Sequence, residues 1–118
     1  MKITLIDMIA KGVEYPLSDD ETIQIGRDLD NDIIIPDRKY RNSLDGPAKL
    51  EFDKIAKTIS REHCIIYQNS GKEPYITDGM STRGTTVNGL NLNEDMNANL
   101  KNGDILKLGD YELMARIE

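Results

Sequence analysis

The sequence predicts an all-β fold, an antiparallel β-sandwich of many short strands, and two observations support this prediction. Short apolar runs alternate with polar residues along most of the 118-residue chain, and turn residues such as Gly, Asn, Asp and Pro separate them. Strands that each bury one face, joined by frequent turns, favour two antiparallel sheets packed together. A chain of this length can bury one core, so we expect a single domain over residues 1–118.

Three strands are expected in the first third of the chain. Ile3 and Leu5 place apolar side chains on one face of a strand over residues 3–5, because alternate strand residues share a face; an extension to residue 8 is left open. Residues 22–25 alternate in the same way and end at a glycine. Residues 32–35, an aspartate followed by three isoleucines, end at a proline, which lacks the N–H that a sheet ladder needs.

The second half of the chain predicts further strands and two tight turns. Apolar runs indicate strands over residues 63–67 and 75–77, and a closing hairpin over residues 105–108 and 111–115. Asn88-Gly89 suits a type I′ turn, which needs two positive φ angles, and we expect Asn102-Gly103 to begin a second such turn.

Residues 38–58 break this rhythm and predict an irregular or short helical insertion. Leu50 and Phe52 alternate as in a strand, whereas Ala48, Leu50, Ile55 and Ala56 would also suit a short helix, and the pattern leaves both open. The insertion holds six basic and three acidic residues, a net charge of +3. Since the whole chain has a net charge of −6, the remaining residues together carry −9. This basic excess predicts a patch that steers phosphorylated or acidic partners; a solvated, mobile loop is the alternative.

Composition excludes several classes of function. A net charge of −6 and a pI of about 4.8 argue against nucleic-acid binding, which needs a surplus of Lys and Arg. One cysteine and one histidine provide no metal cluster, and no nucleophile and base form a credible pair, so we expect no metal, no cofactor and no enzyme activity. The sequence lacks a signal peptide, a disulfide pair and a bilayer-spanning segment, so we expect an intracellular location, cytoplasmic or nuclear in a eukaryote, and no membrane partner.

Four short motifs occur in a fixed order on this strand-and-turn background. They are Gly26-Arg27, Ser60-Arg61-Glu62-His63, Ser81-Thr82-Arg83-Gly84-Thr85 and Val87-Asn88-Gly89. In this order they resemble the forkhead-associated (FHA) domain, a phosphothreonine-reading module, over about residues 22–117. The insertion is the clear departure, because most members pass quickly from the Pro-Asp turn to the Ser-x-x-His motif.

The resemblance implies a binding site made of loops at one end of the sandwich. Arg27, Ser60 and Thr82 would bind the phosphate, which carries nearly two negative charges and three acceptor oxygens. Arg61 and Arg83 would contact the peptide; Arg83 stands where many members have Asn, which leaves the clamping of the peptide backbone in doubt. The implied partner is a phosphothreonine-containing protein or peptide.

The resemblance also implies residues that support the site without touching phosphate. The matching histidine braces the binding loops in the family, so His63 is expected to be structural; Cys64 next to it faces the other side of a strand and is expected to be a small buried residue. The remaining supporting positions are Gly26, Ser81, Gly84, Thr85, Asn88 and Gly89. The function predicted is phosphothreonine-dependent binding in signalling or assembly; the alternative is a phosphate-independent scaffold or oligomerisation domain on the same fold.

Overall fold

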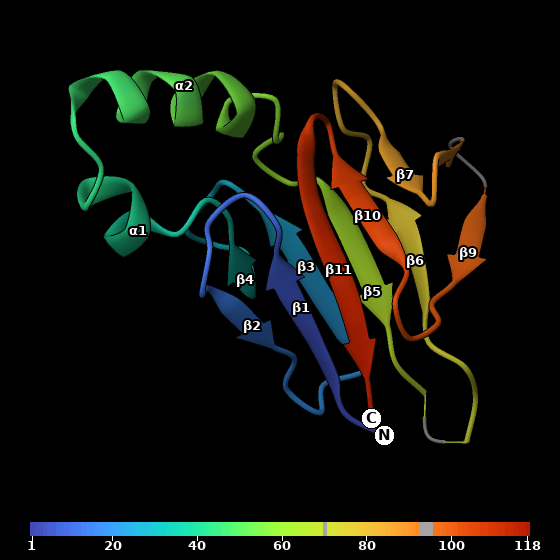
Figure 1. Ribbon diagram of the computed structural model, residues 1–118. Helices are drawn as coiled ribbons and strands as arrows, with labels where there is room; N and C mark the ends of the chain where they lie inside the picture. The colour runs from blue at the N-terminus through green and yellow to red at the C-terminus, as the bar shows by residue number, and fades with distance from the viewer. Residues whose placement is uncertain (70, 93–95) are drawn as a thin grey trace.

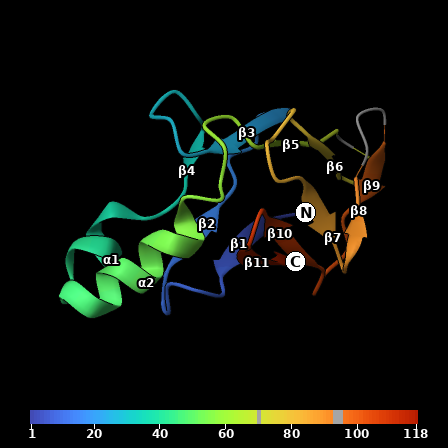
Figure 2. The ribbon, with the colours of Figure 1, turned by 90° about the horizontal axis from the view of Figure 1, so that it is seen from above.

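The computed structural model describes residues 1–69, 71–92 and 96–118, and its strands form two sheets (Figures 1 and 2). The first sheet has the order β2 (Glu14–Pro16), β1 (Ile3–Asp7), β11 (Tyr111–Ile117), β10 (Ile105–Leu108), β7 (Thr85–Val87) and β8 (Leu90–Asn91). The second has the order β4 (Ile33–Ile34), β3 (Thr22–Gly26), β5 (Cys64–Tyr67), β6 (Tyr75–Asp78) and β9 (Asn97–Asn99). Of the paired strands described, β3 and β4 run parallel and the others antiparallel, so the predicted all-β sandwich is confirmed.

The two predicted turns have different outcomes. Asn88 and Gly89 have φ angles of 49° and 84°, which confirms two consecutive positive values between β7 and β8. The type I′ prediction for the second turn is wrong, because Gly103 has a φ of 91° but Asn102 is not among the residues with positive φ. Two short strands were also not expected, namely β2 and β9.

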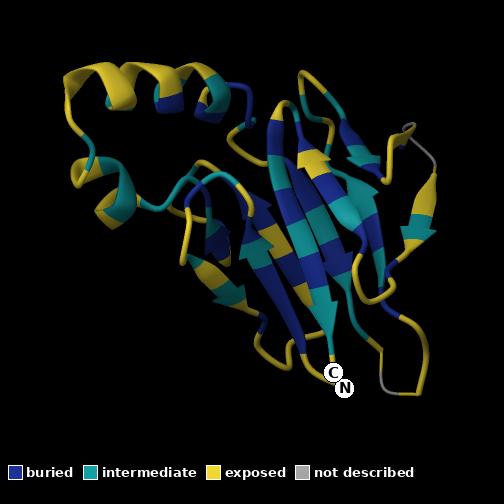
Figure 3. Cartoon of the chain, in the orientation of Figure 1, coloured by how far each residue is buried: buried dark blue, intermediate teal, exposed yellow. Residues whose placement is uncertain are grey.

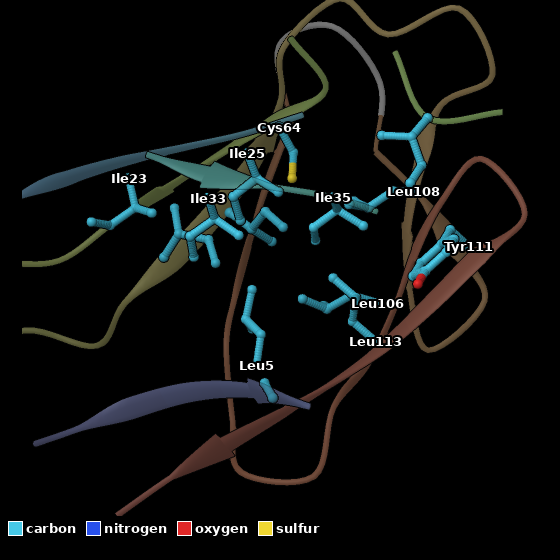
Figure 4. Packing of buried hydrophobic residues seen from close by; sticks show 14 of the residues in the cluster. Leu5, Ile23, Ile25, Ile33, Ile35, Cys64, Leu106, Leu108, Tyr111 and Leu113 are labelled. Atoms are coloured by element: carbon cyan, nitrogen blue, oxygen red, sulfur yellow. The ribbon is translucent and has the colours of Figure 1, made fainter. Parts of the chain in front are cut away.

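The core lies between the two sheets and is filled by alternate residues of their strands (Figure 4). Ile23 and Ile25 of β3 face inward while Thr22 and Gln24 are exposed, which is the alternation that the sequence predicts. From the other sheet, Leu106 and Leu113 are completely buried. The removal of these apolar side chains from water is the main force that holds the sheets together.

One carboxylate is buried at the edge of this core. Asp7 ends β1 and is only 3% exposed. Its Oδ2 accepts hydrogen bonds from the hydroxyls of Tyr15 and Tyr111, each at 2.7 Å, and its Oδ1 accepts from the amides of Ile9 and Ala10 at 2.9 and 2.7 Å. Four donors compensate for the lost hydration of the charge. Burial, together with the Asp7 charge, raises the pKa of both tyrosines.

The insertion is helical, which decides between the two alternatives that the sequence left open. It contains α1 (Arg38–Asn42) and α2 (Gly46–Ala56), each begun by an aspartate N-cap. Phe52 is 5% exposed and contacts the ring of Tyr111 in the sandwich, at a centroid distance of 6.0 Å. Leu50 is 66% exposed, because residues two apart lie on different faces of a helix. Figure 3 shows that much of α2 is exposed.

The helices and several loops gather at the end of the sandwich opposite to the two chain termini (Figure 1). The segment that leaves α2 is tied to the β10–β11 turn, since the Asp110 amide donates to Thr58 Oγ1 at 2.8 Å. This end therefore combines loops from both sheets with the insertion. None of the helices in the described residues has the length and apolar content that crossing a bilayer requires.

Candidate functional site

Three segments that are far apart in the sequence line one open groove of about 690 Å³ at this end of the molecule. They follow β3, α2 and β6. The lining residues are Arg27, Asp28, Lys57, Thr58, Ile59, Ser60, Arg61, Glu62, Gly79, Met80, Thr82 and Arg83. All five residues predicted to touch phosphate or peptide are among them, so the structure brings these side chains to a common groove.

Backbone hydrogen bonds join the first two segments. The Arg27 amide donates to the Ser60 carbonyl and the Asp28 amide donates to the Arg61 carbonyl, each at 3.1 Å. Arg27 Nε also donates to the Ile59 carbonyl. This last bond holds the Nε end of the guanidinium in place, while the Arg27 side chain remains exposed. Within the described part of the chain, no ion pair links the terminal nitrogens of Arg27 to a carboxylate.

Gly26 is required by the close approach of these segments. A Cβ at this position would lie 2.1 Å from the Arg61 carbonyl oxygen and 2.9 Å from Asn31 Nδ2. Since the first of these atoms belongs to the main chain, it cannot move away as a side chain could. The absence of a side chain at Gly26 therefore permits the contact that places Arg27 beside Ser60.

His63 connects the loop that carries Ser60 with the loop that carries Gly84. Its side chain is fully buried, its Nδ1 accepts from the Ser60 amide at 2.9 Å, and its Nε2 lies 2.9 Å from the Gly84 carbonyl. Because the Ser60 N–H must donate, the proton of the neutral ring is assigned to Nε2, which donates to Gly84. Burial lowers the pKa of His63 and so keeps this neutral form.

Ser60 connects the same two loops at the surface of the groove. The Thr82 amide donates to Ser60 Oγ at 2.9 Å. The hydroxyl proton of Ser60 is then free to point towards a ligand, because Oγ acts here as an acceptor. Because the Thr82 amide already has this partner, the hydroxyl is the donor of Thr82 that is left for a ligand.

Asp78, which was not predicted, organises the second loop. Its carboxylate accepts from the Ser81 amide at 3.1 Å, the Ser81 hydroxyl at 2.6 Å and the Thr85 hydroxyl at 2.7 Å. Ser81 Oγ in turn accepts from the Gly84 amide at 2.9 Å. Ser81 and Thr85, which were predicted to support the site, thus bond directly to Asp78, and Gly84 is linked to Asp78 through Ser81. An Asp at a strand end, three residues before a Ser, was the available signal.

Asn31 is a second positioning residue that the sequence did not reveal. It is 7% exposed, and its Nδ2 donates to the carbonyls of Asp28 and Arg61 at 2.9 and 2.7 Å. It therefore holds the turn after β3 against the segment that carries Arg61. Its only sequence signal is an Asn in an Asp-rich turn, and that pattern is common.

None of the predicted supporting residues lines the groove itself, and two of them are also remote from the loops that form it. Asn88 and Gly89 follow β7 at its other end, where Asn88 Oδ1 accepts from the Ile105 amide at 2.8 Å. Their contribution is to the β7–β8 turn and its contact with β10. Arg83 does line the groove, and its guanidinium lies 3.9 Å from the Asp110 carboxylate; both side chains are exposed, so this pair is weak.

The groove is positively charged although the chain is acidic. Four cations line it, among them Lys57, which was not predicted to be a site residue, against two carboxylates, those of Asp28 and Glu62. The Cys64 thiol is buried and burial raises its pKa, which leaves it a protonated, inert group. Within residues 1–69, 71–92 and 96–118, no three His, Cys, Asp or Glu side chains cluster as metal ligands. The arrangement therefore suits the binding of an anion.

The fold and the order of the motifs match a known family of binding modules. The FHA domain model matches residues 23–109, more than half of the chain, and the chain belongs to the FHA domain family. The chain is 33% identical over 86 residues to Germ layers disorganized gldi-3 of Caenorhabditis elegans; this match covers 71% of the chain but only 8% of the worm protein.

Solved structures agree with this assignment. The chain is similar to a structure from a structural and functional analysis of phosphothreonine-dependent FHA domain interactions, with a TM-score of 0.74, 26% identity and coverage of 100% of this chain and 98% of the other. It is also similar to Mycobacterium tuberculosis EmbR in complex with a low affinity phosphopeptide, with a TM-score of 0.71, 26% identity and coverage of 99% of this chain and 24% of EmbR.

Proposed function

We propose that this chain binds phosphothreonine-containing proteins or peptides through the groove and acts in signalling or assembly. The observation that carries the proposal is the convergence of Arg27, Ser60 and Thr82, from three separate segments, on one positively charged groove. Membership of the FHA family and similarity to the phosphopeptide complex of EmbR support it. Binding rather than catalysis fits a site that offers donors and cations.

The phosphate is bound by one permanent cation and hydroxyl donors. Arg27 presents terminal guanidinium nitrogens, and the planar fork of an arginine matches two phosphate oxygens. The Ser60 and Thr82 hydroxyls donate to the phosphate oxygens. A hydrogen bond to a charged group contributes roughly 1.5–3 kcal/mol, so two or three such bonds, less the cost of ordering the peptide, give an affinity on the order of micromolar.

Arg61 and Arg83 border the same groove and contact the flanking peptide. Both side chains are exposed, so they are available to carbonyl or acidic groups of an extended ligand. The loops themselves are held by His63, Asp78 and Asn31, which do not touch the ligand. The site is therefore organised before a ligand arrives, which lowers the entropic cost of binding.

The decisive test replaces Arg27 with alanine. The Arg27→Ala variant is expected to lose at least about tenfold in affinity for a phosphothreonine peptide library, since it loses a charge-assisted contact of about 1.4 kcal/mol or more. Fluorescence anisotropy with labelled peptides measures the affinity, and circular dichroism checks the fold. Lys101→Ala is the matched control, because Lys101 is an exposed cation in the turn before β10 and does not line the groove.

Unphosphorylated peptides of the same composition separate the two functions that this fold offers. Binding that requires phosphate and is lost in Arg27→Ala supports the phosphothreonine module. Equal binding of both peptide sets, or an Arg27→Ala variant that binds as well as the parent, would instead indicate a phosphate-independent scaffold.

A further inference from the structure

A second pocket, of about 370 Å³, lies beside the groove and is bordered by the helical insertion. Arg38, Arg41 and Lys57 line it together with Arg27, and Asp53 is the one carboxylate on its wall. Arg27 and Lys57 line both the pocket and the groove. The two spaces are therefore adjacent, and a ligand in one would lie next to a ligand in the other.

The Asp53 carboxylate is already neutralised by one of these cations. Arg41 Nε donates to Asp53 Oδ1 and a terminal nitrogen of Arg41 donates to Oδ2, each at 2.7 Å. These hydrogen bonds lower the pKa of Asp53, so the pair stays ionised at neutral pH. In the described residues no ion pair involves Arg27, Arg38 or Lys57, so their charges remain available to a ligand.

The insertion holds this pocket in a defined shape. Phe52 packs between Tyr40 of α1 and Tyr111 of β11, at centroid distances of 5.4 and 6.0 Å. Ala56, on the pocket wall one helical turn after Phe52, is only 4% exposed. The pocket is thus built by packed helices and differs from the mobile loop that the sequence left as an alternative.

The charge at this end exceeds what one phosphate would neutralise. The groove and the pocket together present six basic and three acidic residues, a net charge of +3, in a chain whose net charge is −6. A phosphorylated side chain carries about −1.5 to −2 at neutral pH. One phosphate in the groove leaves a positive remainder, and Arg38 accounts for it because Arg41 and Asp53 cancel each other.

We propose that this pocket binds a second phosphorylated side chain of the same peptide, so that the chain prefers doubly phosphorylated ligands. The proposal rests on the proposed function, since the first phosphate occupies the groove. Arg38 is the residue through which the pocket acts, because Arg27 also serves the groove and Arg41 is held by Asp53. A phosphate fits better than a carboxylate because it brings nearly twice the charge to a wall with several cations.

The test uses synthetic phosphothreonine peptides with a fixed central phosphothreonine. One flanking position at a time carries phosphoserine, glutamate or alanine, and the other positions are degenerate. At one or more positions, phosphoserine is expected to raise the affinity about tenfold over alanine, the gain from one charge-assisted contact after the cost of ordering. Arg38→Gln should lose most of this gain and still bind the singly phosphorylated peptides as the parent does.

Lys39→Gln is the matched control, because Lys39 is the next residue of α1, is exposed, and does not line the pocket. It should retain the full gain. No gain from phosphoserine at any position overturns the proposal, as does an equal loss in Arg38→Gln and Lys39→Gln. An equal gain from glutamate overturns the assignment to phosphate. If the singly phosphorylated peptides bind no better than unphosphorylated ones, the proposed function has failed instead.

Discussion

The groove and the helical insertion lie at the same end of the molecule but are held in place by different interactions. The groove is fixed by buried polar contacts, chiefly His63 with its two hydrogen bonds and the close approach of Gly26 to the Arg61 carbonyl. The insertion is attached to the sandwich by apolar packing of Phe52 on Tyr111, and an ion pair between Arg41 and Asp53 joins its two helices.

This difference determines how each region tolerates change. Hydrogen bonds depend steeply on distance and angle, so a small displacement of a loop in the groove breaks them. Apolar packing has no preferred direction and adapts to shifts and substitutions of similar volume. The groove is therefore the rigid part of the site, and the helices of the insertion can vary without displacing Arg27, Ser60 and Thr82.

The largest expected effect is the difference in stability between two variants that each add one methyl group, one in the groove and one in the insertion. Gly26→Ala should cost more than about 3 kcal/mol, the upper end of ordinary overpacking, because its Cβ would meet a main-chain oxygen at 2.1 Å. Gly46→Ala, at the start of α2, should be neutral or stabilising by up to about 1 kcal/mol, since nothing lies within 4 Å of its Cβ. Urea unfolding measures both. Similar costs at the two positions would contradict the comparison.

A smaller effect is expected from emptying the apolar anchor of the insertion. Phe52→Ala should destabilise the docked helices by about 3 kcal/mol, the low end for a buried phenylalanine, because Phe52 lies at the edge of the core. Amide hydrogen exchange should then become faster in α2 but stay slow in β3 and β5.

The matched control for this change lies in the same helix. Leu50→Ala should cost less than about 0.5 kcal/mol, because Leu50 is 66% exposed. If Phe52→Ala accelerates exchange equally in α2 and in both strands, the insertion is not a separate unit and the contrast with the groove is lost.

The sequence predicted the parts of this molecule that depend on local patterns. Alternation in residues 22–25 and the apolar run near residue 65 correspond to β3 and β5, because each strand buries one face. β9 was missed, since Asn97–Asn99 is polar and pairs at the sheet edge with β6, a long-range contact that its own residues do not specify. The insertion stayed ambiguous because its apolar residues fit a strand and a helix alike, and the packing of Phe52 on Tyr111, together with the Asp37 and Asp45 N-caps, favours the helices.

The same distinction applies to the candidate site. Arg27, Ser60 and Thr82 stand in short motifs, so their positions could be predicted from the resemblance to a family. Asp78 and Asn31 act through contacts formed only when the chain folds, and neither belongs to a motif that would single it out. Lys57 enters the groove because α2 ends where it does, which no local pattern announced.

The smallest expected effect tests whether the hydrogen bonds of His63 to Ser60 and Gly84 depend on a neutral imidazole ring. Burial lowers its pKa in the folded state, partly offset by the Gly84 carbonyl and the Asp78 charge, so the unfolded chain binds a proton more readily. Stability should therefore be complete above the ordinary histidine pKa of about 6.5 and fall as the pH drops through that value towards the folded pKa. Protonation would also set two donors, Nδ1–H and the Ser60 amide, against each other.

Urea unfolding of the parent chain and of His63→Gln between pH 7.5 and pH 5.5 measures this effect. His63 is the chain's only histidine, and carboxylates titrate at lower pH, so the difference between the two pH profiles isolates this ring. The parent should lose stability across the window and the variant, which starts less stable because glutamine cannot reproduce both ring contacts, should change less. Parallel profiles would show that the imidazole ring is protonated without loss, and these hydrogen bonds would then not require its neutral form.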